Sequence, residues 1–228
     1  MINRLSLSLP PQEVAAHYSV DRIVTGYEAD ASYRPTEPIP VLYMKGAEQK
    51  ETCLDLHTWG IFPHWAKDSV NAESESIPEK PAYRRLMAKF RCLIPCDGFY
   101  TWRMEGKTRI PVKFTLPGRQ VFGLAGIYDV WKQPSGAEYR TCTILTTRAN
   151  RVIFPYHDRM PVILQEQDTA PWLDPAYRRS DEFLSLLLPY EAEAMMAEER
   201  PGDEAPGRPA KGRETSKRSR WGWAPIKE

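Results

Sequence analysis

The chain has 228 residues, 42% of them hydrophobic, so it is long enough to bury one substantial core. Its 31 basic and 30 acidic side chains nearly cancel, which excludes a protein whose overall positive field attracts nucleic acid, and any DNA binding must rest on a local patch. No apolar run is long enough to span a bilayer, and residues 1–10 lack the pattern of a secretion signal. We therefore expect a cytoplasmic protein with no membrane partner.

A short helix is the first predicted element, over residues 11–18, because it follows a double proline and its apolar residues have helical spacing. Three prolines within residues 33–40 argue against a regular helix or a central strand there. An apolar strand is expected over 41–44, followed by a polar segment over 45–52. Strand patterns then dominate, and strands are expected at 92–95, 98–103, 112–116, 121–130, 142–146 and 160–164.

Helices are the minority in the rest of the chain, with two expected at 81–90 and 180–187. Strands scattered among a few helices predict an α+β fold with a curved or barrel-like, mostly antiparallel sheet and peripheral helices. We expect one domain over residues 1–200. Beyond it, a composition rich in Pro, Gly, Lys and Arg predicts a basic, flexible tail over 201–228.

The tail combines clustered cations with two tryptophans, which is typical of an arm that binds single-stranded nucleic acid. The alternative is a solvated tail whose aromatic residues are incidental. The acidic residues interspersed in the tail favour this alternative. We therefore favour a solvated tail over a nucleic-acid-binding arm.

Four cysteines are present, Cys53, Cys92, Cys96 and Cys142, and without a secretion signal we expect them to be reduced thiols. Cys92 and Cys96 have three residues between them, but no second Cys or His pair lies at the spacing of a zinc site. We interpret these two as small core residues of a strand. The sequence predicts no metal site and no cofactor.

Five stretches of the chain together form a recognisable set: WGIFPHWAKD at 59–68, VNAESES at 70–76, RCLIPCDGFYTW at 91–102, ILTTRAN at 144–150 and HDRMPVIL at 157–164. In this order they resemble the SRAP family, named as SOS response-associated peptidases and understood as abasic-site sensors. The resemblance spans most of residues 1–189. It implies a single SRAP-like domain, a link to the SOS and DNA-damage response, and binding of single-stranded DNA that carries abasic sites.

In that family a cysteine at position two becomes the N-terminus once methionine is removed. Its α-amine attacks the aldehyde of the ring-opened sugar to give an imine, and its thiolate then closes a five-membered thiazolidine ring. The resemblance assigns proton transfer to a glutamate ending the GFYEW motif and to the histidine of HDRMP, and orientation of the reacting end to an asparagine. His157 and Asn71 are the retained catalytic positions in this chain.

Three family positions are changed here. Ile2 replaces the nucleophilic cysteine, and its bulk also disfavours removal of Met1. Thr101 replaces the glutamate, and Glu105, in an expected turn, is no substitute. Glu73 replaces an arginine expected to face DNA phosphate, which turns an attraction into a repulsion. We therefore expect a pseudoenzyme that cannot form the thiazolidine crosslink.

Arg4, Trp65 and Arg159 are the retained candidates for DNA contact, and for each a structural role competes. Trp65 either stacks on an unpaired base or belongs to the core, whereas Trp59 is expected in the core. Both arginines either contact phosphate or form ion pairs, Arg159 with the adjacent acidic residue. His157 is either a general acid or base, its tautomer set by Asp158 or a backbone carbonyl, or a packing residue.

The leading hypothesis is a divergent SRAP-fold protein, monomeric, that binds single-stranded or branched DNA weakly, or binds a protein partner, without crosslinking. One alternative is a residual abasic-site lyase, in which the α-amine of Met1 forms a reversible imine and His157 helps to eliminate the 3′ phosphate. A second is a peptidase that matures its own N-terminus. A third is a protein-interaction scaffold that acts through residues 201–228.

Overall fold

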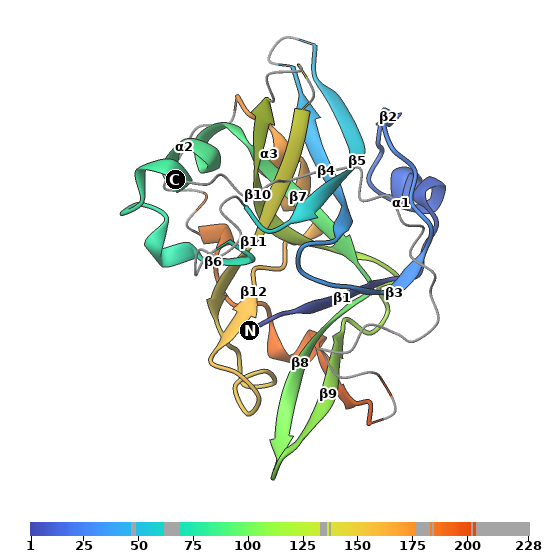
Figure 1. Ribbon diagram of the computed structural model, residues 1–228, viewed down its shortest axis with the longest axis vertical. Coiled ribbons are helices and arrows are strands. Elements are labelled where there is room, and N and C mark those ends of the chain that lie inside the picture. Colours follow the sequence, from blue (N-terminus) through green and yellow to red (C-terminus); the bar gives the residue numbers. More distant parts are fainter. Residues whose placement is uncertain are drawn as a thin grey trace, which may run out of the picture.

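Two packed sheets organise the chain in this computed structural model, which describes residues 1–46, 49–61, 69–132, 136, 138–176, 183, 185–201 and 203. The larger sheet curls into a barrel, and the smaller one lies below it in Figure 1. The described helices sit at the periphery of the sheets. The predicted α+β fold with a barrel-like, mostly antiparallel sheet is confirmed.

Five strands form the barrel in the order β11-β10-β7-β4-β5. They are β4 (Pro38–Lys45), β5 (Glu51–Trp59), β7 (Arg91–Cys96), β10 (Phe122–Lys132) and β11 (Glu138–Arg148). Neighbouring strands along this order are antiparallel, and the ring closes where β11 pairs in parallel with β5, with Cys142 opposite Trp59. Closure removes the exposed edges that an open sheet would present.

The smaller sheet has the order β13-β9-β8-β1-β3. Its strands are β1 (Arg4–Leu7), β3 (Asp30–Tyr33), β8 (Gly98–Glu105), β9 (Thr108–Thr115) and β13 (Met196–Glu199). The hairpin of β8 and β9 projects at the lower end of Figure 1, and β1 crosses the middle of the molecule. The N-terminal strand is therefore placed between the hairpin and the barrel.

Shorter elements complete the described part of the chain. They are α1 (Pro11–His17), β2 (Arg22–Ile23), β6 (Asn71–Glu73), η1 (Ser74–Ser76), α2 (Pro81–Lys89), β12 (Arg159–Pro161), α3 (Glu166–Leu173) and η2 (Ala192–Ala194). Both β6 and β12 pair with β11, β6 in parallel and β12 antiparallel. Two of the five sequence motifs therefore lie on either side of the far end of β11.

The barrel interior is filled by side chains that alternate along its strands. Tyr128 of β10 lies 5.2 Å from the ring of His57 on β5 and 5.3 Å from that of Tyr43 on β4. Since β10 pairs with neither of these strands, the contacts must cross the interior. Trp59 is fully buried and donates its indole N–H to Val70 O at 2.9 Å, which confirms it as a core residue.

Most predicted elements are confirmed. The expected helices at 11–18 and 81–90 are α1 and α2, and each expected strand overlaps an observed one, although β12 ends at Pro161. Several elements were not predicted, among them β1, β5, which begins inside the supposed polar segment, and α3, whose interior Pro171 disguises it. Of the expected helix at 180–187, residues 183, 185 and 186 are helical and the others before 187 lie outside the described residues.

The exclusion of a central strand from residues 33–40 is wrong, because β4 begins at Pro38 and includes Pro40. The N–H of Trp59 on β5 donates to Glu37 O, so by alternation the proline nitrogens point away from β5. On the other side of β4, β7 pairs further along the strand, beyond both prolines. Neither proline therefore removes a needed hydrogen bond.

The predicted tail cannot be compared with the structure. Of residues 201–228, only 201 and 203 are among the described residues. The tail and its tryptophans therefore stay a prediction.

Candidate functional site

The chain begins at the junction of the two sheets, where several contacts hold its first residues. The side-chain amide of Asn71 donates to Ile2 O at 2.7 Å, and Trp102 donates its indole N–H to Asn3 Oδ1 at 2.7 Å. Asn71 itself is buried on β6, which pairs with β11. The backbone at position 2 is thus fixed from β6, while β8 fixes position 3.

Neither changed family position provides a reactive group at this place. Ile2 is 4% exposed and packs in the core, so position 2 contributes apolar contacts. Thr101 is also buried, on β8 opposite Val112. A thiol and a carboxylate are therefore both missing from the two positions where the SRAP resemblance requires them.

The α-amine of Met1 and the imidazole of His157 both have lowered pKa values. Burial lowers the pKa of the amine, and the negative charge of Asp158 partly opposes this. Burial also lowers the pKa of His157, and the positive charge of the N-terminus adds to the effect. Burial is the largest cause in both cases, so both groups hold a free lone pair at lower pH than they would in water.

A hydrogen bond from the backbone orients His157. The N–H of Arg159 donates to His157 Nδ1 at 2.9 Å, which leaves the proton of the neutral ring on Nε2. Asp158 Oδ1 also lies 2.9 Å from Nδ1, so it pairs with that nitrogen when the ring is charged. From the sequence we expect Asp158 or a backbone carbonyl to set the tautomer of His157. In the structure a backbone N–H donates to Nδ1 instead of a carbonyl accepting from it, and Asp158 lies beside the same nitrogen.

The side chain of Arg159 is held by a carboxylate. It donates to both oxygens of Glu75, at 3.0 and 2.7 Å, and to Thr146 O on β11. Burial raises the pKa of Glu75, but the hydrogen bonds from Arg159 and from backbone outweigh it, so the net shift is downward. The ion pair expected for Arg159 is made with Glu75 rather than with Asp158.

Arg4 is paired in a similar way. Its side chain lies over the ring of Tyr100, 4.2 Å from the centroid, with Nη2 3.8 Å from Asp203 Oδ2. It is 8% exposed. Glu73 lies on β6 opposite Thr146. The positions expected to attract phosphate therefore present two partly neutralised cations and one anion.

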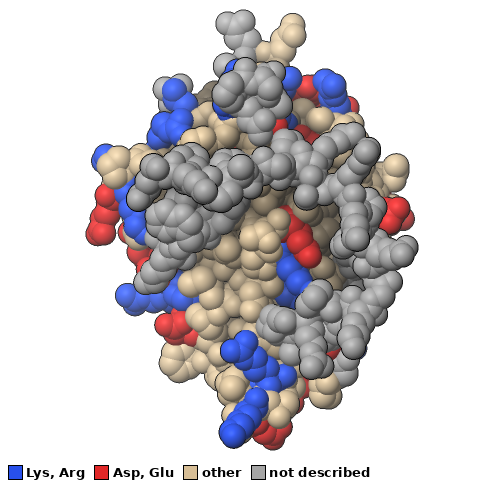
Figure 2. Space-filling model, in the orientation of Figure 1, with Lys and Arg blue, Asp and Glu red and all other residues tan. Residues whose placement is uncertain are grey.

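The charged surface agrees with this picture. On the face drawn in Figure 2, Lys/Arg and Asp/Glu side chains are interspersed around an uncharged middle. Lys and Arg gather at the lower end, where Figure 1 places the tip of the β8–β9 hairpin, which carries Arg103, Lys107 and Arg109. Arg103 is paired there with Glu199 and Glu105, so part of this positive charge is neutralised.

Two polar atoms at the site are buried without a hydrogen-bond partner among the described residues: Asn71 Oδ1 and Arg159 Nε. Buried polar atoms are normally paired, so unpaired ones need an explanation. One is an acceptor and the other a donor; Asn71 also contacts the backbone of Ile2, and the Arg159 side chain lies at Glu75 and Thr146. A polar ligand at this place would satisfy them.

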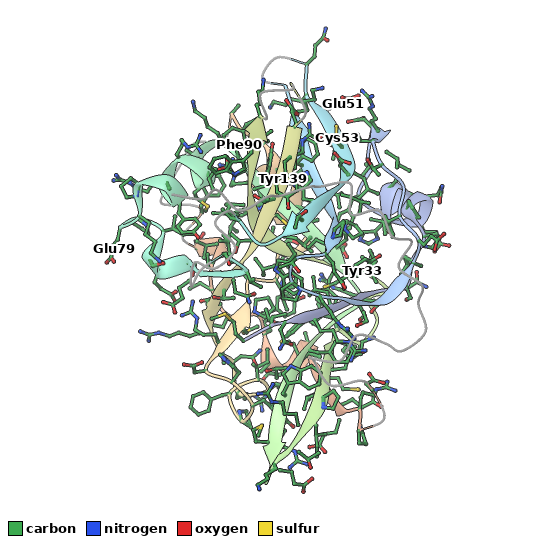
Figure 3. All side chains as sticks on the ribbon, viewed as in Figure 1. Tyr33, Glu51, Cys53, Glu79, Phe90 and Tyr139 are labelled. Atoms are coloured by element: carbon green, nitrogen blue, oxygen red, sulfur yellow. The ribbon has the colours of Figure 1, made fainter. Side chains whose placement is uncertain are left out.

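The cysteines do not contribute to the site. All four are free and buried, and burial raises the pKa of Cys92, Cys96 and Cys142. Cys53, labelled in Figure 3, lies near the upper end of β5, well away from the N-terminus marked in Figure 1. Cys92 and Cys96 lie on β7 as predicted. Within the described ranges no group of His, Cys, Asp and Glu is arranged to hold a metal ion.

Asn71 contacts the backbone of Ile2, and His157 lies close enough to the N-terminus for that charge to affect its pKa, whereas the catalytic and DNA-binding roles of Asn71, His157 and Arg159 stay predictions. Trp65 lies outside the described residues. Two neighbours of the site were missed. Trp102 ends a recognised motif, and Phe154 stands beside a proline just before His157, so both had a signal in the sequence.

Comparison with known proteins identifies what this chain is similar to. Residues 1–199 match the family model described as SOS response associated peptidase (SRAP). The chain is 35% identical to the abasic site processing protein YoqW of Bacillus subtilis, over 86% of this chain and 91% of that protein. It is 37% identical to the abasic site processing protein YoaM of the same organism, over 86% and 89%.

A solved structure of a Bacteroides thetaiotaomicron protein aligns with a TM-score of 0.74 and 28% identity, over 86% of this chain and 90% of that one. A Bordetella bronchiseptica protein aligns with a TM-score of 0.73 at 22% identity, over 88% and 99%, and shows the shared fold alone. In the part of the chain that the structure describes, no helix has the length and apolar character needed to cross a membrane.

Proposed function

Because this chain belongs to the SRAP family, whose model matches residues 1–199, we propose that it binds single-stranded DNA at abasic sites without forming the thiazolidine crosslink. Its relatives are named abasic site processing proteins, which supports the association with abasic sites and DNA damage. The finer points, which are single-strand binding, absence of crosslinking and action as a cytoplasmic monomer, are part of the proposal.

The lack of a thiol at the N-terminus carries this proposal. Closing a thiazolidine requires an amine and a thiolate on one residue, and the side chain at position 2 is a buried isoleucine. The cysteines of the chain are buried elsewhere, where burial also keeps thiols protonated. No other residue of the chain supplies a thiol at that position.

Binding itself is supported by Asn71 Oδ1 and Arg159 Nε, which are buried without a hydrogen-bond partner among the described residues. A bound DNA strand could supply those partners. The binding is weak in this account, because Arg4 and Arg159 are already paired with carboxylates and Glu73 repels phosphate. Each phosphate contact contributes about 0.7 to the salt dependence of single-strand binding. We therefore expect a shallow dependence of affinity on salt.

The test mixes the protein with a labelled single strand carrying one natural abasic site, with an intact strand as control. Native and denaturing gels are run in parallel. A native shift that favours the abasic strand and disappears on denaturation is the expected result. Equal or absent binding to the two strands overturns the proposed function.

A second candidate function is a residual lyase, and the position of the Met1 amine favours it. The amine is partly buried, burial lowers its pKa, and His157 lies close enough for the charge of the N-terminus to lower the pKa of the imidazole. Only the neutral form of an amine can attack an aldehyde. Burial thus favours the nucleophilic form of the amine even though the thiol is missing.

The steps of this reaction balance without a further reagent. The amine nitrogen adds to the aldehyde carbon and water leaves, giving a protonated imine. His157 takes a proton from the adjacent carbon, the electron pair moves toward the imine, and the 3′ carbon–oxygen bond breaks with loss of phosphate. Water then hydrolyses the imine and returns the free amine.

Strand cleavage at the abasic site and trapping of a covalent adduct by borohydride test this candidate. Selective acetylation of the α-amine abolishes both in this account, with intact mass confirming that the protein begins at Met1. Cleavage that persists after complete acetylation contradicts the role of Met1. Binding without cleavage contradicts the lyase and leaves the leading proposal standing.

A further inference from the structure

The segment between β11 and β12 forms a firmly held turn that leads into His157. Asn150 Oδ1 accepts the N–H groups of Val152 and Ile153, both at 3.1 Å, and its amide donates to Tyr190 O at 2.8 Å. Phe154 N–H donates to Asn150 O at 2.9 Å. The turn is therefore fixed at its base by backbone and side-chain hydrogen bonds.

Within this turn two residues face the interior. Ile153 is buried, and the ring of Tyr156 packs edge-on against Phe114 of β9, with the centroids 5.7 Å apart. His157 N–H donates to Ile153 O at 3.0 Å, which closes one helical turn. Residues three apart in such a turn share a side, as Ile153 and Tyr156 do.

By the same spacing, Phe154 shares the other side of the turn with His157. Phe154 is 68% exposed, the most exposed of the large hydrophobic residues in the described part of the chain. Water contact with a phenyl ring is unfavourable, and this ring is held outward by an anchored backbone. A ring presented in this way loses little freedom when a flat partner covers it.

We propose that Phe154 stacks on an unpaired base next to the abasic nucleotide. This rests on the proposed function, since the occupant is the single strand that the N-terminal site binds. Stacking on an aromatic ring is a contact that every base can make, so it suits a site with little free positive charge. The strand is then held by one base and by the unpaired polar atoms near the N-terminus.

The experiment measures the affinity of the full chain for an abasic single strand that carries 2-aminopurine beside the abasic site. Stacking quenches this base. Phe154→Ala is expected to weaken binding about 5- to 100-fold and to remove the quenching, while Phe154→Trp retains both. Phe154→Leu keeps apolar bulk without a ring and is expected to behave as Phe154→Ala.

Trp131→Ala is the matched control, because Trp131 is also exposed, at 43%, but lies at the other end of the barrel. Trp131 is opposite Tyr139 at the start of β11, whereas β12 pairs with its last residues, about 30 Å along the strand. This variant is expected to bind and quench as the parent does. Thermal unfolding of each variant confirms that it is folded.

The outcomes separate the two proposals. A parent protein that binds the abasic strand, with Phe154→Ala folded and unchanged in affinity and quenching, overturns the stacking role and leaves the proposed function intact. Full binding by Phe154→Leu also overturns it, because bulk alone then suffices. A parent protein that does not prefer the abasic strand overturns the proposed function, and the stacking role falls with it.

Discussion

Two clusters in this molecule contain the same kinds of side chain but differ in access. The barrel cluster consists of Tyr43, Asp55, His57 and Arg140, and the N-terminal cluster of Met1, Asn71, His157, Arg159 and Glu75. Each pairs an arginine with a carboxylate: Arg140 lies 2.7 Å from Asp55, as Arg159 does from Glu75. Each also holds a histidine whose pKa burial lowers, in His57 to about 3.

Access separates the two clusters. His57 is fully buried, and neither of its ring nitrogens has a hydrogen-bond partner within the described ranges. His157 is partly exposed, oriented by a backbone N–H, and adjacent to a primary amine. A lowered pKa therefore does not by itself mark a functional site. Exposure together with a reactive neighbour makes His157 the better candidate.

The largest effect is expected from replacing each histidine in turn. His157→Gln removes the base of the proposed lyase and should slow strand cleavage about 10²- to 10⁴-fold, while abasic-strand affinity changes little. His57→Gln should leave the cleavage rate unchanged. Cleavage is followed on denaturing gels at saturating protein. Equal losses in the two folded variants would show that the comparison between the clusters is mistaken.

The next effect concerns stability in acid. The unfolded state of His57 takes up a proton near pH 6.5, whereas the folded state does so near about 3, so between these values unfolding binds protons. This group therefore lowers stability as pH falls below about 6.5, by at most about 1.4 kcal/mol per unit. His57→Leu removes this dependence and the unpaired nitrogens, so it should be more stable than the parent.

Urea unfolding of both proteins at pH 7 and pH 5 measures this difference. We expect the advantage of His57→Leu to be about 1 kcal/mol at pH 7 and larger at pH 5. Carboxylates such as Glu75 and Asp97, whose pKa values are lowered, are shared by both proteins and cancel in the comparison. An advantage that does not grow in acid contradicts the assignment to His57.

The smallest effect is expected from reversing one charge near each cluster. Glu73→Arg near the N-terminal cluster should tighten binding of the abasic strand and steepen its salt dependence by about one phosphate contact. Glu51→Arg changes net charge equally but lies at the upper end of the barrel (Figure 3), so it should have little effect. Equal gains would mean that net charge, rather than position, determines affinity.

Much of this comparison could be predicted from the sequence, because the motifs are local. The motif residues Asn71 and His157 are recognised by their neighbours in the chain, and the alternating strands by their period of two. Burial of Trp59 followed from its size and apolar character. These features depend on nearby residues, and the structure places Asn71 and His157 beside the N-terminus as the family pattern implies.

The remaining features depend on pairing between distant segments. The barrel closes through β5 and β11, and Arg159 pairs with Glu75, 84 positions away in the chain, rather than with its neighbour Asp158. Nothing in the local pattern specifies such partners. The pairing of Arg4 with Asp203 is a further example. Asp203 follows β13, a short strand that the sequence pattern did not predict. The sequence therefore identified the candidate site but not its neutralised charges.

The most direct test of the central claim compares the parent protein with Ile2→Cys and with Ile2→Cys combined with Thr101→Glu. Each is incubated with abasic single-stranded DNA without reductant and analysed on a denaturing gel, with intact mass showing whether Met1 is removed. The account predicts no denaturation-resistant band for the parent and a band for the cysteine variants. A stable band formed by the parent would contradict it.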